Sequence, residues 1–173
     1  MQFIETKIPG LTIIEPKVFL DNRGYFMESF KEEEFRKAIG SINWIQDNES
    51  KSSKGVLRGL HLQTGDFAQA KLVRVVVGKV FDVAVDVRKG SPTYGQYVGV
   101  ELSDENHRQL FIPRGFAHGF LVLSDTCIFQ YKVDNIYCKE SEDGFHYESF
   151  GIEWPKIDKG FIISEKDAIL KLA

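Results

Sequence analysis

The chain has 173 residues, of which 43% are hydrophobic and 27% are charged, and its formal net charge at pH 7 is -3. This length and composition predict one domain, residues 1–173, with a substantial apolar core. The negative charge argues against a nucleic-acid-binding surface, and no apolar run approaches the roughly 18 residues that a membrane helix needs.

The ends and the cysteines indicate a cellular compartment. The N-terminal segment 1–7 lacks the basic stretch and apolar run of a secretory signal, so we expect a cytoplasmic protein. Cys127 and Cys138 have no CxxC partner and no nearby histidine at metal-ligand spacing. Both are therefore expected to be free thiols in a reducing compartment.

The first clear element is a short helix over residues 31–39. Two glutamates stand four residues before Arg36 and Lys37, which favours ion pairs along one helix face. Gly40 is placed to end the helix. We expect it to be short and mostly solvated.

The C-terminal two thirds of the chain has mainly the pattern of β-strands. Residues 71–77 and 80–88 flank Gly78-Lys79, which predicts a hairpin with a two-residue turn. A second hairpin is expected between residues 121–123 and 127–133.

The alternation of residues 80–88 predicts how that strand is buried. Valines occupy one face, and the other face carries Asp82, Asp86 and Arg88, as in a half-buried antiparallel strand. Many short strands, with turn signals at intervals of roughly 8 to 12 residues, favour an all-β jelly roll. The closing segment 154–173 is expected to lie over the barrel as an irregular tail.

His61 stands between two leucines in a predicted strand, so its side chain should point away from both. The imidazole there could be a base, a metal ligand or a hydrogen-bonded structural group. Arg58 has the opposite parity and would point away from His61 in a regular strand. We predict a bulge at Gly59 that brings both side chains into one pocket.

Segment 113–118, Pro-Arg-Gly-Phe-Ala-His, resembles the second short motif of cupins, in which the histidine is usually a metal ligand. The first cupin motif is broken, because His61-Leu-Gln63 stands where it requires HxH. Lys71 would also set a positive charge beside any divalent ion. Since two histidines are too few for a typical zinc or iron site, we predict that no metal is bound.

Three further residues have both a structural and a functional interpretation. Tyr131 shares its strand face with apolar residues, so it is either a core residue or a proton donor facing His61. Asp167 is a surface residue unless the C-terminal tail folds back on the barrel. In that case its carboxylate would contact His61 and fix the tautomer of the imidazole. Arg23 is either a solvated turn residue or, with Arg58, a ligand for phosphate at a barrel mouth.

Several longer segments stand in a distinctive order. They are DNRGYFMESF at 21–30, QDNESKSSKGVLRGLHLQ at 46–63, AKLVRVVVGKVFDVAVDVR at 70–88, SPTYGQYVGVELS at 91–103, FIPRGFAHGFLVLS at 111–124, YKVDNIY at 131–137, GIEWP at 151–155 and ISEKD at 163–167. Together they resemble the dTDP-4-dehydrorhamnose 3,5-epimerase family over nearly the full chain.

The resemblance implies a cupin-type double-stranded β-helix with a few short helices, without metal or cofactor, and usually a homodimer. The activity it implies is inversion of C3 and C5 of a dTDP-4-keto-6-deoxyhexose, on the route to dTDP-L-rhamnose. In this likeness His61 is the base and Asp167 its carboxylate partner. Lys71 stabilises the enolate, and Tyr131 is the acid.

The resemblance also implies a set of substrate contacts. Arg23 and Arg58 bind the diphosphate, and Tyr137 stacks on thymine. The nucleotide sugar is further lined by Glu28, Gln46, Asp47, Asn48, His118, Glu142 and Lys166. Segment 147–150, Tyr-Glu-Ser-Phe, departs from the family, in which many members have Asn-Asp-Pro after the first position.

Three alternatives remain open at this point. A related enzyme could invert only one of the two carbons, and shared motifs do not separate that activity from double inversion. A non-catalytic jelly roll could bind a sugar nucleotide without turnover, although it would need neither a base nor an acid. A metal-dependent cupin isomerase or dioxygenase would require a bound metal in the purified protein.

Overall fold

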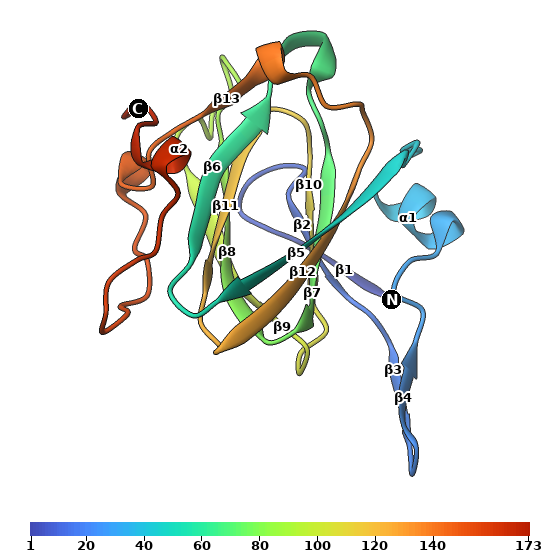
Figure 1. Cartoon of the computed structure of the whole chain (residues 1–173). Helices are drawn as coiled ribbons and strands as arrows, with labels where there is room; N and C mark the ends of the chain where they lie inside the picture. The colour runs from blue at the N-terminus through green and yellow to red at the C-terminus, as the bar shows by residue number, and fades with distance from the viewer.

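The computed structural model describes all 173 residues, and most of its regular structure is β (Figure 1). The strands are β1 (Gln2–Glu5), β2 (Thr12–Glu15), β3 (Val18–Asp21), β4 (Gly24–Met27), β5 (Gln46–Ser53), β6 (Leu57–Gln63), β7 (Lys71–Val77), β8 (Lys79–Asp86), β9 (Tyr97–Ser103), β10 (Gln109–Ile112), β11 (Phe116–Val122), β12 (Thr126–Val133) and β13 (Glu142–Gly144). The helices are α1 (Glu32–Ala38) and α2 (Glu165–Ala168), with 3-10 turns η1 (Gly65–Phe67), η2 (Lys139–Ser141) and η3 (Ser149–Gly151).

Two antiparallel sheets face one another. One has the order β1-β2-β10-β7-β12-β5 and the other the order β13-β6-β11-β8-β9, while β3 and β4 form a separate hairpin. Fifteen buried residues, including Leu110 and Phe129, pack as one apolar cluster. The prediction of an all-β protein with a few short helices is confirmed. None of the helices has the length and apolar character needed to cross a membrane.

Both predicted hairpins are wrong, because the strands concerned lie in different sheets. β7 pairs with β10 and β12, whereas β8 pairs with β9 and β11. The turn at Gly78 is therefore a crossing between sheets at one end of the barrel. Its backbone N–H donates to Asp104 Oδ2 at 2.8 Å, and the N–H of Lys79 donates to Ser124 Oγ at 2.8 Å. These side chains replace the ladder bonds that a hairpin would make.

The predicted half-burial of β8 is also wrong, although its alternation is real. Val83 and Val85 belong to an apolar cluster with Phe145, Phe150 and other partly buried residues of the C-terminal segment. The opposite face is no more exposed, since both of its carboxylates, Asp82 and Asp86, are fully buried. A buried carboxylate must be compensated, so each of the two requires an explanation.

The outer face of the six-stranded sheet is covered by the N-terminal part of the chain. Phe35 of α1 packs there with Leu72 and Phe111. The helix confirms the prediction for 31–39 to within one residue at each end, and Lys37 Nζ lies 2.6 Å from Glu33 Oε1.

The closing segment follows an irregular path over the five-stranded sheet, as predicted (Figure 1). Ile162 forms an isolated bridge with Val56, and Trp154 packs on the cluster that contains Val83 and Val85. The segment then forms the single turn of α2. This route brings a stretch near the C-terminus back to the barrel mouth.

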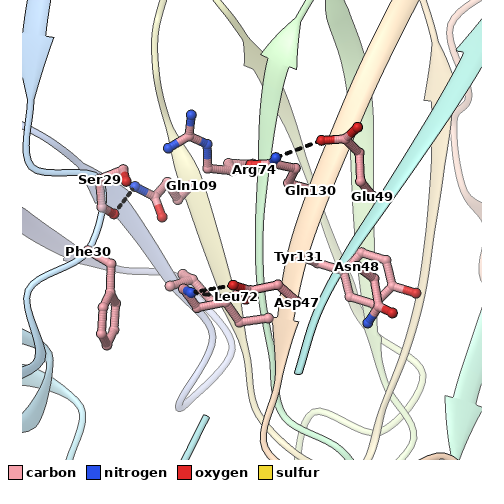
Figure 2. Close-up of a pocket in the computed structure, with 11 residues that line it drawn as sticks. Ser29, Phe30, Asp47, Asn48, Glu49, Leu72, Arg74, Gln109, Gln130 and Tyr131 are labelled. Atoms are coloured by element: carbon pink, nitrogen blue, oxygen red, sulfur yellow. Dashed lines mark hydrogen bonds and ion pairs between the residues drawn. The ribbon is translucent and has the colours of Figure 1, made fainter. Parts of the chain in front are cut away.

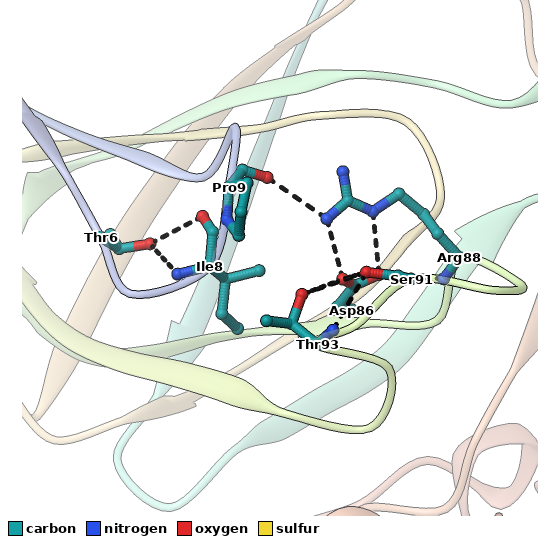
Figure 3. Close-up of polar contacts among 7 residues, drawn as sticks. All are labelled: Thr6, Ile8, Pro9, Asp86, Arg88, Ser91 and Thr93. Carbon is teal, nitrogen blue, oxygen red and sulfur yellow. Dashed lines mark hydrogen bonds and ion pairs between the residues drawn. The ribbon is translucent and has the colours of Figure 1, made fainter.

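Asp86 is held by a closed hydrogen-bond network (Figure 3). Its carboxylate accepts from Arg88 Nε at 2.9 Å, from Arg88 Nη2 at 2.8 Å, and from the hydroxyls of Ser91 and Thr93 at 2.6 Å each. Arg88 also donates to the carbonyl oxygen of Pro9 at 3.2 Å, which ties this loop to the N-terminal segment. Burial raises the pKa of Asp86, but these donors outweigh it and hold the pKa well below its usual range.

We expect Asp86→Asn to lower the free energy of unfolding by about 2–4 kcal/mol, because it unpairs a buried network. Urea titration at pH 7 measures this loss. Because the folded-state pKa is depressed, the wild-type advantage is present above the unfolded-state pKa and disappears as the pH falls toward the folded-state value. Lys37→Met, which breaks only a surface pair, should cost about 0.5 kcal/mol or less. Equal losses in the two variants would contradict the assignment.

Candidate active site

A cavity of about 400 Å³ lies between the two sheets. Lys71 of β7 and Tyr131 of β12 line it from the six-stranded sheet, and His61 of β6 and His118 of β11 line it from the other. Asp167 of α2 lines it from the C-terminal segment. All four residues expected to be catalytic, His61, Lys71, Tyr131 and Asp167, therefore surround one space.

The predicted bulge at Gly59 is confirmed. His61 pairs with His118 and Arg58 pairs with Phe120, so two residues of β6 lie opposite Gly119 alone. A side chain at Gly59 would meet Gly119 Cα and the carbonyl oxygen of His118 at 2.6 Å. Because glycine permits this approach, Arg58 and His61 both line the cavity in spite of their opposite parity.

His61 and Asp167 form the contact that links the barrel to the C-terminal segment. His61 Nε2 lies 2.7 Å from Asp167 Oδ1, and the other carboxylate oxygen accepts from the N–H of Gly59 at 3.1 Å. Burial raises the pKa of Asp167, but its bonds to His61, Gly59 and Ser164 outweigh burial and leave the pKa lowered. The carboxylate is therefore ionised beside an imidazole that is 32% exposed to the cavity.

Lys71 and Tyr131 are perturbed by the same low-dielectric surroundings. Burial lowers the pKa of Lys71 to about 8, although the charges of Asp82 and Glu142 oppose that shift. Burial also raises the pKa of Tyr131, opposed by the charge of Arg58. Near neutral pH the cavity thus holds a charged but easily deprotonated lysine and a protonated phenol.

His118 forms a second imidazole–carboxylate pair deeper in the barrel. Its Nε2 lies 2.9 Å from Asp82 Oδ2 and 3.1 Å from Oδ1, and its ring stacks on Phe129. Burial lowers the pKa of His118 more than the attraction of Asp82 raises it. No three histidine, cysteine or carboxylate side chains are grouped so that they could hold a metal ion.

The other expected contact residues divide into four groups. Arg58, Asn48, His118 and Lys166 line the main cavity. Asp47 lies in an adjoining pocket of about 200 Å³, which shares Asn48 and Tyr131 with the cavity (Figure 2).

Tyr137, Glu142 and Lys166 line a third pocket, of about 350 Å³, that also includes His61. The hydroxyl of Tyr137 donates to Glu142 Oε2 at 2.8 Å, and Lys166 forms an ion pair with the same carboxylate. This polar group lies at the edge of the cavity. Segment 147–150, whose sequence departs from the family pattern, lines none of these three pockets.

Arg23, Glu28 and Gln46 line none of these three pockets. Gln46 stands at the start of β5 and donates to Asn48 Oδ1 at 2.7 Å, which places it next to the site. Arg23 follows β3 in a hairpin that extends away from the barrel, and its guanidinium pairs with Asp21 (Figure 1). Glu28 pairs with Lys31.

Asp82 is a site residue that the sequence pattern does not reveal. The alternation of residues 80–88 predicts a solvated face for it, but it is fully buried and contacts His118, which lines the cavity. The alternation within residues 80–88 gave no signal for this burial, because it depends on the position of β8 between β9 and β11 in the five-stranded sheet. In that interior position of the sheet a charged side chain is costly.

The fold and the cavity define a class of protein, a cupin-type barrel with acid–base groups on facing walls. The family model described as dTDP-4-dehydrorhamnose 3,5-epimerase matches residues 5–173. The enzyme of that name from Shigella flexneri is 57% identical over 96% of this chain and 93% of its own length. The chain belongs to the dTDP-4-dehydrorhamnose 3,5-epimerase family, and it is an isomerase.

Solved structures agree with this assignment. The dTDP-6-deoxy-D-glucose-3,5-epimerase from Legionella pneumophila, in complex with dTDP-4-keto-L-rhamnose, is 51% identical with a TM-score of 0.95, covering 99% of this chain and 92% of that one. A 3'-monoepimerase from Streptomyces bikiniensis, in complex with dTDP-quinovose, is 32% identical with a TM-score of 0.92, covering 98% and 86%. The predicted cupin-type jelly roll is thereby confirmed.

We expect Gly59→Ala to lower activity by at least about tenfold, because an added methyl group would separate β6 from β11 and displace His61. Steady-state kinetics measure kcat and KM for the variant. Gly90→Ala is the matched control: Gly90 also has a positive φ, of 78°, but nothing lies within 4 Å of its added carbon. Similar kinetic losses in the two variants would show that backbone strain, and not the bulge, is responsible.

Proposed function

We propose that His61 and Tyr131, on facing walls of the cavity, are the base and the acid of the reaction. The chain catalyses 3,5-epimerisation of dTDP-4-dehydro-6-deoxy-D-glucose to dTDP-4-dehydro-L-rhamnose, in dTDP-L-rhamnose biosynthesis. A ketone at C4 acidifies the hydrogens on both neighbouring carbons. A base on one face and an acid on the other can therefore invert each carbon in turn.

The contact between His61 and Asp167 is the observation on which the proposal depends. An ionised carboxylate at 2.7 Å from Nε2 accepts the proton on that nitrogen and leaves Nδ1 as the lone-pair atom. Nδ1 of His61 has no hydrogen-bond partner within the protein. It is therefore free to remove a proton from C3 or C5, and Asp167 stabilises the imidazolium that results.

Lys71 stabilises the negative charge that develops on the C4 oxygen. Removal of either proton produces an enolate, and a cation in a low-dielectric cavity lowers the energy of that state more than it would in water. A lysine whose pKa is about 8 is also able to donate a proton to the oxygen. Both actions favour the enolate.

Tyr131 returns the proton from the opposite face. Its strand belongs to the six-stranded sheet, whereas the strand of His61 belongs to the other sheet. Its raised pKa keeps the phenol protonated at neutral pH, so a proton is available when the enolate forms. Inversion follows because removal and return use different faces.

The remaining residues would bind the nucleotide. Arg58 is exposed and lines the cavity, where its guanidinium suits bidentate binding of diphosphate. Tyr137, with an exposed ring, is placed to stack on thymine. We assign binding of the sugar and its neighbouring phosphate to six further residues, Gln46, Asp47, Asn48, His118, Glu142 and Lys166.

Deuterium exchange tests the activity and the single-carbon alternative together. With dTDP-4-keto-6-deoxyglucose in deuterated water, we expect NMR to show incorporation at both C3 and C5. Exchange at one carbon alone would instead identify a single-carbon epimerase. Tight binding without exchange would identify a binding module.

We expect Tyr131→Phe to retain proton removal but to lose at least about 100-fold in formation of the epimerised product, because only the return of the proton requires the phenol. His61→Asn should abolish exchange at both carbons. Measuring exchange and product formation in the same NMR sample separates the two steps. Unchanged epimerisation by the Tyr131→Phe variant would contradict the assignment of Tyr131 as the acid.

We also propose that the protein is a homodimer in which the β3–β4 hairpin contacts the partner. The hairpin stands away from the barrel and exposes large apolar side chains, with Leu20 at 81% and Phe26 at 66% (Figure 1). Strand β5 ends its sheet and offers an unpaired edge near the cavity. Arg23 of one subunit, with Glu28, would then reach the diphosphate in the other.

We expect Leu20→Asp to weaken the dimer at least about 100-fold, because it puts a charge into an apolar contact. Sedimentation velocity at micromolar concentration gives the fraction of dimer. Ile169→Asp is the control, since Ile169 is 84% exposed but directly follows α2, away from the hairpin (Figure 1). A dimer that survives Leu20→Asp would contradict the proposed interface.

The proposal also covers the domain organisation and the cellular compartment. We propose that residues 1–173 act as one epimerase domain, because the cavity is lined by both sheets and by the C-terminal segment together. The two cysteines are not bonded to each other, which supports a reducing compartment such as the cytoplasm.

A further inference from the structure

Two carboxylates of β8 are equally buried but differently compensated. Asp86 and Asp82 stand four residues apart on the same strand, and neither side chain is exposed. Asp86 accepts from a guanidinium group and two hydroxyls. Asp82 accepts only from Nε2 of His118 and has no lysine or arginine within ion-pair distance.

A buried carboxylate with one donor costs stability, because a single hydrogen bond does not replace its lost hydration. An apolar residue would pack there at lower cost. Asp82 therefore requires an explanation other than stability. The location of Asp82 supplies that explanation. Asp82 lies beside His118 and interacts favourably with the charge of Lys71, and both His118 and Lys71 line the cavity.

We propose that Asp82 is a positioning residue, which acts on the substrate through Lys71 and His118. Its negative charge balances the Lys71 ammonium group, and its oxygens accept the proton on His118 Nε2. This inference rests on the proposed function only where it concerns catalysis. The effects on the two side chains can be measured without substrate.

The bond to His118 determines what that ring presents to the cavity. If Nε2–H donates to Asp82, then Nδ1 of the neutral ring is an acceptor. Burial lowers the pKa of His118 and keeps it neutral at neutral pH. Nδ1 has no protein partner, yet it is not an enclosed atom, so it faces the cavity. A sugar hydroxyl that contacts it must donate its hydrogen.

The effect on Lys71 is electrostatic. The groups that face its ammonium from neighbouring elements include two that interact with it through their negative charge, Asp82 of β8 and Glu142 of β13. Glu142 is also paired with Lys166 and accepts from Tyr137. Asp82 has no such competing cation. The other charged or titratable residues lining the cavity are Glu49, Arg58, His61, His118, Tyr131, Lys166 and Asp167.

The wild-type protein provides the first test. Long-range 1H–15N correlation at pH 7 distinguishes histidine tautomers, and His118→Asn assigns the signal. We expect the Nε2–H form at His118. A neutral ring protonated on Nδ1 would overturn the proposal without the need for any variant of Asp82.

The second test separates charge from hydrogen bonding. Asp82→Asn removes the charge but keeps an oxygen that can accept from His118, whereas Asp82→Ala removes both. With 13C-labelled lysine, assigned through Lys71→Met, we expect the titration midpoint of Lys71 to fall by at least about half a pH unit in both variants. The tautomer of His118 should become mixed only in Asp82→Ala. An unchanged midpoint would contradict the proposed role.

Activity gives the third readout and distinguishes this proposal from the proposed function. As the Lys71 midpoint falls, the alkaline limb of kcat should move to lower pH in Asp82→Asn, with up to about a tenfold loss at pH 8.5 and a smaller loss at pH 6.5. Asp86→Asn is the matched control, which should lower the melting temperature without moving the pH profile. If the Lys71 midpoint moves while the kcat profile does not, then the assigned role of Lys71 fails, and that of Asp82 stands.

Discussion

The contact between His61 and Asp167 is the interaction on which the site depends. It joins two residues 106 positions apart in sequence and fixes the C-terminal segment to the barrel mouth. The same carboxylate accepts from the backbone at Gly59, where β6 bulges against β11. A single side chain therefore contacts the imidazole proposed as the base, holds a C-terminal segment that lines the cavity, and supports the backbone at the bulge that lets Arg58 line it too.

The polar cavity exists within a barrel that is otherwise stabilised by apolar packing. Apolar clusters lie between the sheets and on the outer face of each, so the fold does not depend on the cavity for its stability. Polar groups in such a space are costly unless they are paired. The Asp86 carboxylate, which stabilises the fold, accordingly accepts hydrogen bonds from a guanidinium group and two hydroxyls. The Asp82 carboxylate accepts only from His118. The two carboxylates of β8 are thus equally buried but differ in how many donors they have.

Local sequence patterns predicted strands well but predicted their partners badly. The turn at Gly78 has the length and composition of a hairpin turn, yet it joins strands of different sheets. Gly78 could not accept a side chain, because its added carbon would lie 2.1 Å from the carbonyl oxygen of Thr126 in the other crossing segment. A glycine required by close packing of two crossings is indistinguishable in sequence from one required by a tight turn.

The sequence by itself determined the family, the all-β class, helix α1 and the residues proposed for catalysis, because ordered motifs and strand periodicity are local properties. It also predicted the bulge, since parity alone excluded a shared pocket for Arg58 and His61 in a regular strand. Only the tertiary structure decided which strands pair, that Asp82 faces the interior, and that Arg23 lies outside the cavity of its own chain. Strand pairing and the directions of these side chains depend on contacts between segments that are distant in sequence. Those contacts form only when the two sheets close on one another.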